Sequence, residues 1–420
     1  MKYIQVLVIT VVFMTITAHA QNWPQWRGPE GNGVAAAGNY PVKFSDKDGL
    51  LWKSELPGKG GSTPIVWKDR IFLTSGIGDD EEGEDGVLCF DWSGKLLWQV
   101  KLGKQNPGKH PRGSGSNPSI VTDGQRLFAY FKSGTVAALD YKGNILWKTN
   151  LQEKYGKVIL YWDLGTSPIL ANGNVVIAVM HGGPSYLVAL DQASGKVAWK
   201  VDRNYTCSDE SDHSYATPLL VNEGERNIIV VWGADHLTGH DAKTGEMIWE
   251  CGGFNPANRE YWRVIASPVI SQGIAVVPYG RGKHLAGVKI GGTGDITKSA
   301  RLWEKKGTST DVATPVVIDG KTYIVDFKGN VWCLDIQTGN EIWEDEIPRG
   351  KGVFYSSPTL AGNTLYLIRE EGTFYICEII PTGINVLNQI DFDDYFVATP
   401  VLVQDRILLR GDKYLYCIGK

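Results

Sequence analysis

The sequence predicts an all-β protein, an eight-bladed β-propeller with four antiparallel strands in each blade. Three observations lead to this fold class. A proline-centred unit recurs along the chain, a Trp stands late in nearly every unit, and short apolar runs alternate with Gly-containing turns. Repeats of roughly 40 to 50 residues are typical of propellers, in which each repeat supplies one blade.

The first anchor of the repeat is a Ser/Thr-Pro step followed by an apolar run. Proline is tolerated there because the first residue of a strand need not donate to the ladder. Consecutive prolines stand 42 to 54 residues apart. The steps contain Pro64, Pro168, Pro218, Pro268, Pro315, Pro358 and Pro400, and Asn117-Pro118 is expected to fill the remaining place.

The second anchor is a Trp near the end of each unit. These residues are Trp52, Trp98, Trp147, Trp199, Trp249, Trp303 and Trp343, and Val386-Leu387 stands in the eighth place. Between the anchors, Asp-Gly and Thr-Gly steps separate apolar runs of hairpin length. The sixth unit, for example, predicts strands at Pro315–Ile318, Thr322–Phe327, Val331–Asp335 and Glu341–Glu346.

The two ends of the repeat region indicate a closed ring. Only 20 residues follow Pro400, enough for three strands, whereas Leu50–Leu56 reads as a fourth strand with no unit before it. We therefore expect residues 50–420 to form the propeller, with an N-terminal strand that completes the last blade. Closure of this kind removes exposed sheet edges. Residues 21–49 form a lead-in segment.

The first 20 residues have the pattern of a secretory signal peptide. Lys2 precedes an apolar stretch that ends at Ala18-His19-Ala20, a pattern typical of cleavage before Gln21. An uncleaved anchor is the alternative, but the apolar run is shorter than the ~20 residues that a spanning helix needs. We expect an exported protein, periplasmic or extracellular, monomeric and with no membrane span in its mature part.

Charge and cysteine content narrow the class further. Loss of Lys2 changes the formal charge from −4 to −5, which gives no electrostatic reason to bind nucleic acid. For Cys207 and Cys251 a disulfide and two free thiols both remain open. Four other cysteines occupy one repeated strand position and are expected to be core residues, too far apart to pair: Cys89, Cys333, Cys377 and Cys417.

Several motifs give the chain a family resemblance. They are the opening Asn22 to Pro29, the Leu-Asp-x-x-Thr/Ser-Gly-x-x-x-Trp units such as Leu190 to Trp199, the stretch Gly291 to Thr297, and the tail Leu415 to Ile418. Over residues 22–420 these motifs resemble secreted bacterial pyrroloquinoline-quinone-like (PQQ-like) propeller proteins. The resemblance implies the fold but leaves function open. The superfamily holds quinone-dependent alcohol dehydrogenases as well as the propeller lipoprotein of the outer-membrane assembly machine, which binds no quinone.

The loops that enter the first strands are the candidate site, because in a propeller they surround one mouth of the channel. Aromatic and charged residues alternate in them, and this fits either capped blade ends with solvated charges or a concave binding site. The candidate ligand-binding residues are Arg112, Trp162, Asp163, Trp262, Arg263, Asp311, Tyr355, Asp394 and Tyr395. We expect a non-catalytic protein that binds a glycan, a small molecule or an envelope protein at this mouth.

Two enzymatic alternatives stay open. A polysaccharide lyase acting on acidic sugars would use His213 and Tyr215 as the base and the acid. Arg263, Arg112 or Lys59 would hold the uronate carboxylate.

A quinone-dependent dehydrogenase would stack PQQ on Trp162 or Trp262 and hold calcium at Asp163 or Asp394. The resemblance implies a disulfide between adjacent cysteines over the quinone, and the sequence has no Cys-Cys pair and no Cys-x-x-Cys-His haem motif. We therefore predict no cofactor and no metal site. The acidic run from Asp79 to Asp85 reads as a solvated loop, and Gly291 to Gly294 as an insertion in blade five.

Overall fold

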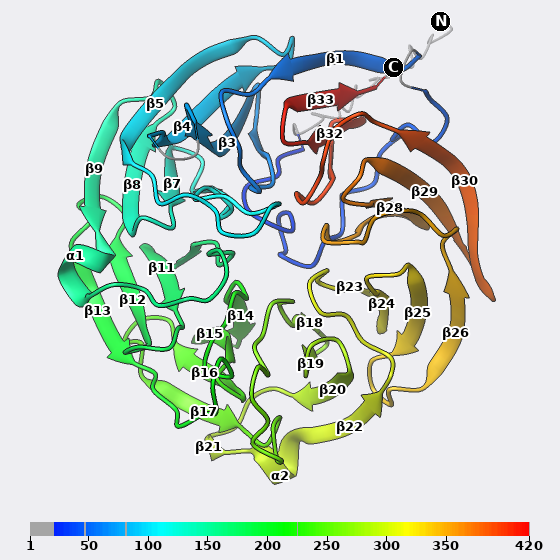
Figure 1. Ribbon diagram of the computed structural model, residues 1–420. Helices are drawn as coiled ribbons and strands as arrows, with labels where there is room; N and C mark the ends of the chain where they lie inside the picture. Colours follow the sequence, from blue (N-terminus) through cyan, green and yellow to red (C-terminus); the bar gives the residue numbers. More distant parts are fainter. Residues whose placement is uncertain (1–20, 46–47, 80–81, 225, 420) are drawn as a thin grey trace, which may run out of the picture.

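The computed structural model describes residues 21–45, 48–79, 82–224 and 226–419, and it shows eight antiparallel sheets arranged in a ring (Figure 1). Each sheet is one blade, with its first strand nearest the axis and its fourth strand at the rim. The predicted eight-bladed, all-β propeller is confirmed. The predicted signal peptide, residues 1–20, lies outside the described residues.

The strands of each blade follow one another from the axis to the rim. In blades one to four they are β2 (Ile65–Trp67), β3 (Arg70–Ile77), β4 (Glu84–Asp91), β5 (Leu96–Lys104); β6 (Val121–Thr122), β7 (Arg126–Tyr130), β8 (Thr135–Asp140), β9 (Ile145–Asn150); β10 (Ile169–Ala171), β11 (Asn174–Val179), β12 (Tyr186–Asp191), β13 (Val197–Asp202); β14 (Leu219–Glu223), β15 (Arg226–Gly233), β16 (His236–Asp241), β17 (Met247–Cys251). In blades five to eight they are β18 (Val269–Ser271), β19 (Ile274–Tyr279), β20 (His284–Lys289), β22 (Arg301–Lys306); β23 (Val316–Ile318), β24 (Lys321–Val325), β25 (Asn330–Asp335), β26 (Glu341–Glu346); β27 (Thr359–Ala361), β28 (Thr364–Ile368), β29 (Thr373–Ile380), β30 (Gly383–Asp391); β31 (Val401–Val403), β32 (Arg406–Arg410), β33 (Tyr414–Ile418), β1 (Leu50–Glu55).

Helices are limited to α1 (Leu151–Tyr155) and α2 (Thr297–Ala300) in the described ranges. Neither has the length and apolar character that a membrane crossing requires.

The N-terminal strand closes the ring as predicted. β1 pairs antiparallel with β33, so that Trp52 lies opposite Cys417 and Ser54 opposite Leu415. Just beyond the strand, the backbone N–H of Leu56 donates to the Lys413 carbonyl at 2.9 Å. The last blade is thus built from both ends of the described chain.

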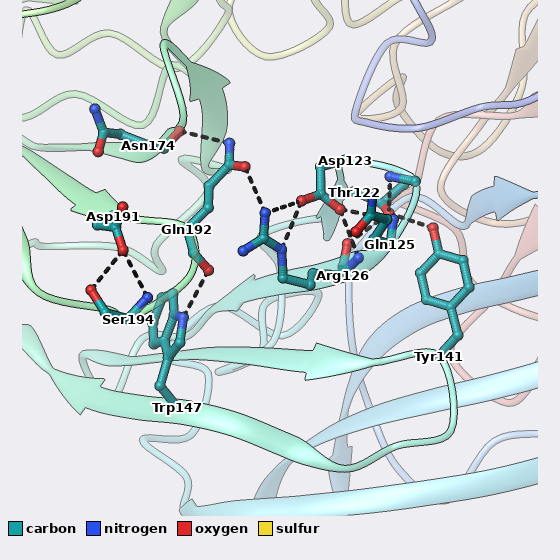
Figure 2. A network of polar contacts seen from close by, with 11 residues as sticks. Thr122, Asp123, Gln125, Arg126, Tyr141, Trp147, Asn174, Asp191, Gln192 and Ser194 are labelled. Carbon is teal, nitrogen blue, oxygen red and sulfur yellow. Dashed lines mark hydrogen bonds and ion pairs between the residues drawn. The ribbon is translucent and has the colours of Figure 1, made fainter.

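Repeated Trp residues tie several blades to the next, and Figure 2 shows Trp147 and the Asp191 turn at the link between blades two and three. The Trp147 indole Nε1 donates to the Gln192 carbonyl at 3.0 Å, while Asp191 accepts two hydrogen bonds from Ser194 and shapes the turn. Gly195 has φ +67°, and a Cβ there would lie 2.6 Å from the Trp147 ring. The turn therefore requires glycine. Equivalent indole-to-carbonyl bonds are made by Trp52, Trp98 and Trp303.

A ring of hydroxyl groups surrounds the channel where the first strands begin. In it, the backbone N–H of one blade donates to the Ser or Thr hydroxyl of the next, at 2.9 to 3.3 Å. The donor–acceptor pairs are Thr63 to Ser119, Ser119 to Ser167, Ser167 to Thr217, Thr217 to Ser267, Ser267 to Thr314, Thr314 to Ser357, and Thr399 to Thr63. The last of these bonds joins blade eight to blade one. We call this set the hydroxyl ring.

The predicted place of Asn117-Pro118 in the repeat is wrong by two residues. Ser119 supplies the hydroxyl of blade two, because it accepts the N–H of Thr63 at 2.9 Å. The Asn117 side chain instead accepts hydrogen bonds from the backbone and hydroxyl of Ser114. The prediction located this step by its proline. The structure places the repeated hydroxyl at Ser119, which is followed by Ile120 and not by proline.

The lead-in segment crosses the end of the channel beyond the hydroxyl ring, and its dark blue trace passes near the centre of Figure 1. Trp23 and Val66 exchange backbone hydrogen bonds of 2.8 and 2.9 Å, which attach the segment to blade one. The Ala35 N–H donates to the Leu360 carbonyl of blade seven at 2.7 Å. The segment therefore closes one end of the channel by pairing with the inner edges of first strands.

Arg27 fixes the middle of the lead-in segment and is fully buried. Its guanidinium donates to the Pro358 carbonyl at 2.6 Å, to the Pro315 carbonyl, and to Asn32. Burial lowers the pKa of Arg27 to about 9. Gly33 is required beside it, because a Cβ there would lie 2.1 Å from the guanidinium. Arg27 thus joins the lead-in segment to blades six and seven.

The glycine-rich insertion of blade five reaches the neighbouring blade. Between β20 and β22 the chain forms β21 (Gly294–Asp295), which pairs parallel with β17 of blade four. Trp249 of β17 lies opposite Gly294 and is fully buried. The insertion therefore covers the outer edge of blade four.

All six cysteines are free thiols. The four at the repeated strand position are buried in the core, as predicted. The open question of Cys207 and Cys251 is answered by two unpaired thiols, Cys251 being buried in β17 and Cys207 partly buried in a loop.

The acidic run predicted as a solvated loop ends inside a strand, since Glu84 and Asp85 belong to β4 and Asp85 is buried. Asp85 gives the first prediction, which concerns stability. Its side chain is fully buried in β4, and burial raises its pKa to about 7. The carboxyl Oδ2 accepts a hydrogen bond from the Ser133 hydroxyl, whereas Oδ1 has no hydrogen-bond partner in the described structure. Its folded-state pKa thus exceeds the unfolded value. The folded carboxyl retains a proton that the unfolded one loses, so stability falls as the pH rises from about 4 to 7. Asp85→Asn is expected to stabilise the protein at pH 8 by on the order of 3 kcal/mol and to flatten this dependence.

Urea unfolding at pH 5 and pH 8 measures the effect. The exposed Asp48, replaced by Asn, is the control and should follow the wild type. An Asp85→Asn protein as pH-sensitive as the wild type would contradict the prediction.

Candidate functional site

A cavity of about 410 Å³ occupies the channel between the hydroxyl ring and the mouth, and we call it the funnel. Trp26 of the lead-in segment lies at the closed end of the funnel, where the residues of the hydroxyl ring also line the cavity. The loops that enter the first strands supply its mouth. Its volume lies within the ~300 to 1,000 Å³ that is usual for ligand pockets.

The mouth carries a continuous row of aromatic rings. The His110 ring lies edge-on to Trp162, with centroids 5.4 Å apart, and edge-on to Tyr355 at 5.7 Å. Phe327 continues the row beyond Tyr355 at 5.6 Å, and Tyr161 flanks Trp162 at 5.0 Å. Edge-to-face contacts of this kind stabilise one another and hold the rings in place. The row therefore forms a preorganised apolar wall.

The loop between β5 and β6 crosses the mouth and narrows it. Arg112 of this loop pairs through Nε with Glu370 of blade seven at 3.1 Å, and its guanidinium lies 3.3 Å from the centroid of the Tyr395 ring. At the loop's other end, Asp163 of blade three accepts the backbone N–H groups of Lys109 and His110. Residues from blades three, seven and eight thus fix the loop.

The charges that line the funnel are largely neutralised by ion pairs. Arg112 pairs with Glu370, Asp163 with Lys132 at 2.7 Å, and Arg263 with Glu210 at 2.9 Å. The two other charged lining residues, Arg281 and Asp311, have opposite signs. Burial raises the pKa of Asp311, while Arg263 and Arg281 oppose this shift. The funnel is therefore an apolar-walled site with little net charge.

The structure brings together six of the nine residues predicted to bind a ligand. Arg112, Trp162, Asp163, Arg263, Asp311 and Tyr355 all line the funnel. Tyr395 lies outside it, against Arg112. Trp262 is buried, with its Nε1 donating to the Phe254 carbonyl at 2.9 Å. Asp394 is buried and accepts from the backbone of Tyr395, Lys413 and Tyr414.

Three residues of the lyase hypothesis occupy different surroundings. Tyr215 and Arg263 line the funnel, and His213 does not. The His213 ring is buried, its Nε2 lies 3.6 Å from Asp212, and burial lowers its pKa. Burial raises the pKa of Tyr215 to about 12, and its hydroxyl accepts the backbone N–H of Trp162.

The funnel does not fit PQQ and calcium. PQQ carries three carboxylates, whereas Arg112 and Arg263 already pair with Glu370 and Glu210. Asp163 is engaged by Lys132 and two backbone N–H groups, so the lining does not offer the several oxygen ligands that calcium takes. In the described part of the chain no three His, Cys, Asp or Glu side chains form a metal-binding group.

Sequence reasoning missed several lining residues, and those with aromatic or charged side chains are Trp26, His110, Arg281 and Phe327. The Trp-Pro-Gln-Trp-Arg-Gly motif marked Trp26 as unusual without showing that the lead-in segment enters the channel. His110 belongs to the long connection before blade two, and this length was a usable signal. Arg281 and Phe327 lie in hairpin turns on the same face as the entering loops.

Comparison with known proteins supports the fold at low identity. BamB of Yersinia pestis is 23% identical over 72% of this chain and 67% of its own length. Polyvinylalcohol dehydrogenase of Sphingopyxis sp. is 22% identical over 80% of this chain and 52% of its own length. The solved BamB of Moraxella catarrhalis superposes with TM-score 0.59 at 13% identity, covering 88% of this chain and 99% of that one. A europium-containing methanol dehydrogenase superposes with TM-score 0.68 at 11% identity, and the superposition covers 94% of this chain and 90% of the dehydrogenase.

A family model places the chain more firmly. The model described as outer membrane protein assembly factor BamB matches residues 34–183 and 132–379, which together span most of the propeller. The resemblance to PQQ-like propeller proteins is confirmed, and the expected export agrees with a family named for outer membrane protein assembly. The chain belongs to the BamB-like family of PQQ-like propellers.

Proposed function

We propose that this protein binds a partner protein of the cell envelope by receiving a polypeptide segment of that partner in the funnel. The observation that carries the proposal is the combination of a fixed aromatic row with paired charges. Aromatic and Arg side chains dominate the energetic centres of protein interfaces. An acidic sugar would compete with Glu370 and Glu210 for Arg112 and Arg263, which leaves Arg281 as the lining arginine that could hold its carboxylate.

The comparisons support a binding role. Several relatives are named outer membrane protein assembly factor BamB, and such a name describes assembly rather than a chemical reaction. We assign the contact to Trp162 and Tyr355, whose rings line the funnel. Arg281 and Asp311 also line it and can bind a peptide backbone or side chain of either charge.

Trp162→Ala tests the assignment. Truncation of a buried aromatic anchor costs an interface about 2 kcal/mol, so we expect partner affinity to fall roughly 30-fold. The partner is first identified by placing a photoreactive phenylalanine analogue at position 355 in a bacterium that exports the protein. Irradiation should produce a covalent adduct with one envelope protein, whose affinity is then measured with purified components.

The control places the same analogue at Leu51, which is 42% exposed on the outer strand β1. An adduct formed equally well at Leu51 would contradict the proposal, as would an affinity unchanged by Trp162→Ala. Release of unsaturated sugar from an acidic polysaccharide, or dye-linked alcohol oxidation, would favour the enzymatic alternatives instead. Binding of neutral oligosaccharides in the funnel would indicate that its ligand is a glycan and not a protein segment.

A further inference from the structure

A second cavity, of about 450 Å³, lies on the other side of the hydroxyl ring from the funnel. Its walls are the turn of the lead-in segment that includes Gln25 and Glu30, and the first strands of blades three, four and five, β10, β14 and β18. We call it the inner-edge groove.

The lead-in segment shows how this propeller holds an extended chain at such a place. Trp23 pairs with Val66 of β2, the Pro24 carbonyl accepts from Thr122 of β6, and Leu360 of β27 donates to the Gly33 carbonyl at 2.9 Å. Blades one, two and seven thus receive backbone partners at their inner edges. Strand addition to an exposed edge is a common mode of peptide recognition.

Blade four presents the free counterpart of these edges. β14 has five residues, whereas the other first strands have two or three. Within the described ranges, β14 pairs only with β15 and forms the end of its sheet. The longest first strand therefore turns an unpaired backbone edge towards the inner-edge groove.

The side chains of the groove indicate what would lie along that edge. Leu220 lines the groove and remains 44% exposed, and Leu170 and Ile270 add apolar surface from the neighbouring blades. Glu30 is exposed and is the one charged residue among the described residues that line the groove. The surroundings therefore match an aliphatic side chain beside a basic one.

We propose that the inner-edge groove binds an extended segment of a partner protein, by strand addition to β14. The segment places an aliphatic side chain on Leu220 and a Lys or Arg beside Glu30. This site is separate from the funnel and does not depend on the function proposed for it.

The test pans a phage-displayed library of random linear peptides against the mature protein. Enriched peptides are expected to combine an aliphatic residue with Lys or Arg, and their binding should slow hydrogen exchange in Leu219–Glu223. Leu220→Asp should weaken them at least tenfold. Panning against Glu30→Lys should select acidic peptides in place of basic ones.

Two controls separate this site from other surfaces. Leu51→Asp alters a leucine of similar exposure at the rim and should leave binding unchanged, as should Trp162→Ala in the funnel. Peptides that bind Leu220→Asp as well as the wild type would overturn the proposal. So would failure to enrich any sequence, or loss of binding in Trp162→Ala alone, which would place the peptides in the funnel.

Discussion

Deletion of residues 21–56 is expected to leave a chain that no longer unfolds in one cooperative transition. The deletion removes β1, whose loss exposes the whole outer edge of β33, and it also removes the lead-in segment that closes the channel. Exposed strand edges pair with other molecules, so we expect aggregation. Any monomer that remains should melt lower by more than about 10 °C, a shift that several kcal/mol would produce.

Shorter deletions separate the two contributions. Removal of residues 21–45 alone keeps β1 and should leave a closed ring with reduced stability, whereas removal of residues 21–56 should open it. Light scattering and differential scanning calorimetry distinguish these states. A monodisperse protein with the wild-type melting temperature after the longer deletion would show that the last blade does not need its N-terminal strand.

Replacement of Arg27 is expected to have the largest effect of any single substitution. Arg27→Ala leaves the carbonyls of Pro315, Pro358 and Asn32 without their donor at the closed end of the channel, and creates a cavity where the side chain was. A buried carbonyl left without its donor costs about 1 to 3 kcal/mol, and three carbonyls lose a donor here, so we expect a loss of about 4 kcal/mol.

Companion variants test the cause of this loss. Arg27→Met keeps much of the volume and removes the charge, so it should lose less than Arg27→Ala. Gly33→Ala should destabilise through the same contact, because its Cβ would meet the guanidinium. Urea unfolding measures all three. Equal stability of Arg27→Ala and the wild type would mean that the lead-in segment is held by its backbone pairing alone.

Local signals explain why the fold could be predicted. Most blades repeat an Asp turn, a Gly and a Trp, and these residues act within one blade or between neighbours, as Trp147, Asp191 and Gly195 show. Blade seven has Val386-Leu387 in the place of the Trp. The exact register of blade two could not be predicted, because Ser119 carries the hydroxyl without the proline that marks it elsewhere.

The funnel was less predictable because long-range contacts set its loops. Trp162 and Trp262 each follow a Tyr and precede a charged residue, yet the first lines the funnel and the second is buried against Phe254. The pairing of Arg112 with Glu370, 258 residues away, fixes a loop across the mouth. A single sequence does not reveal such a partner.

The pairing of β1 with β33 also sets the order of events during synthesis. Trp52 emerges long before its partner Cys417, so the closing sheet cannot form until the strands of the last blade have been synthesised. Contacts at such sequence separation form slowly. The nascent chain therefore passes through an open horseshoe with two unpaired edges, a form that a binding chaperone would have to shield.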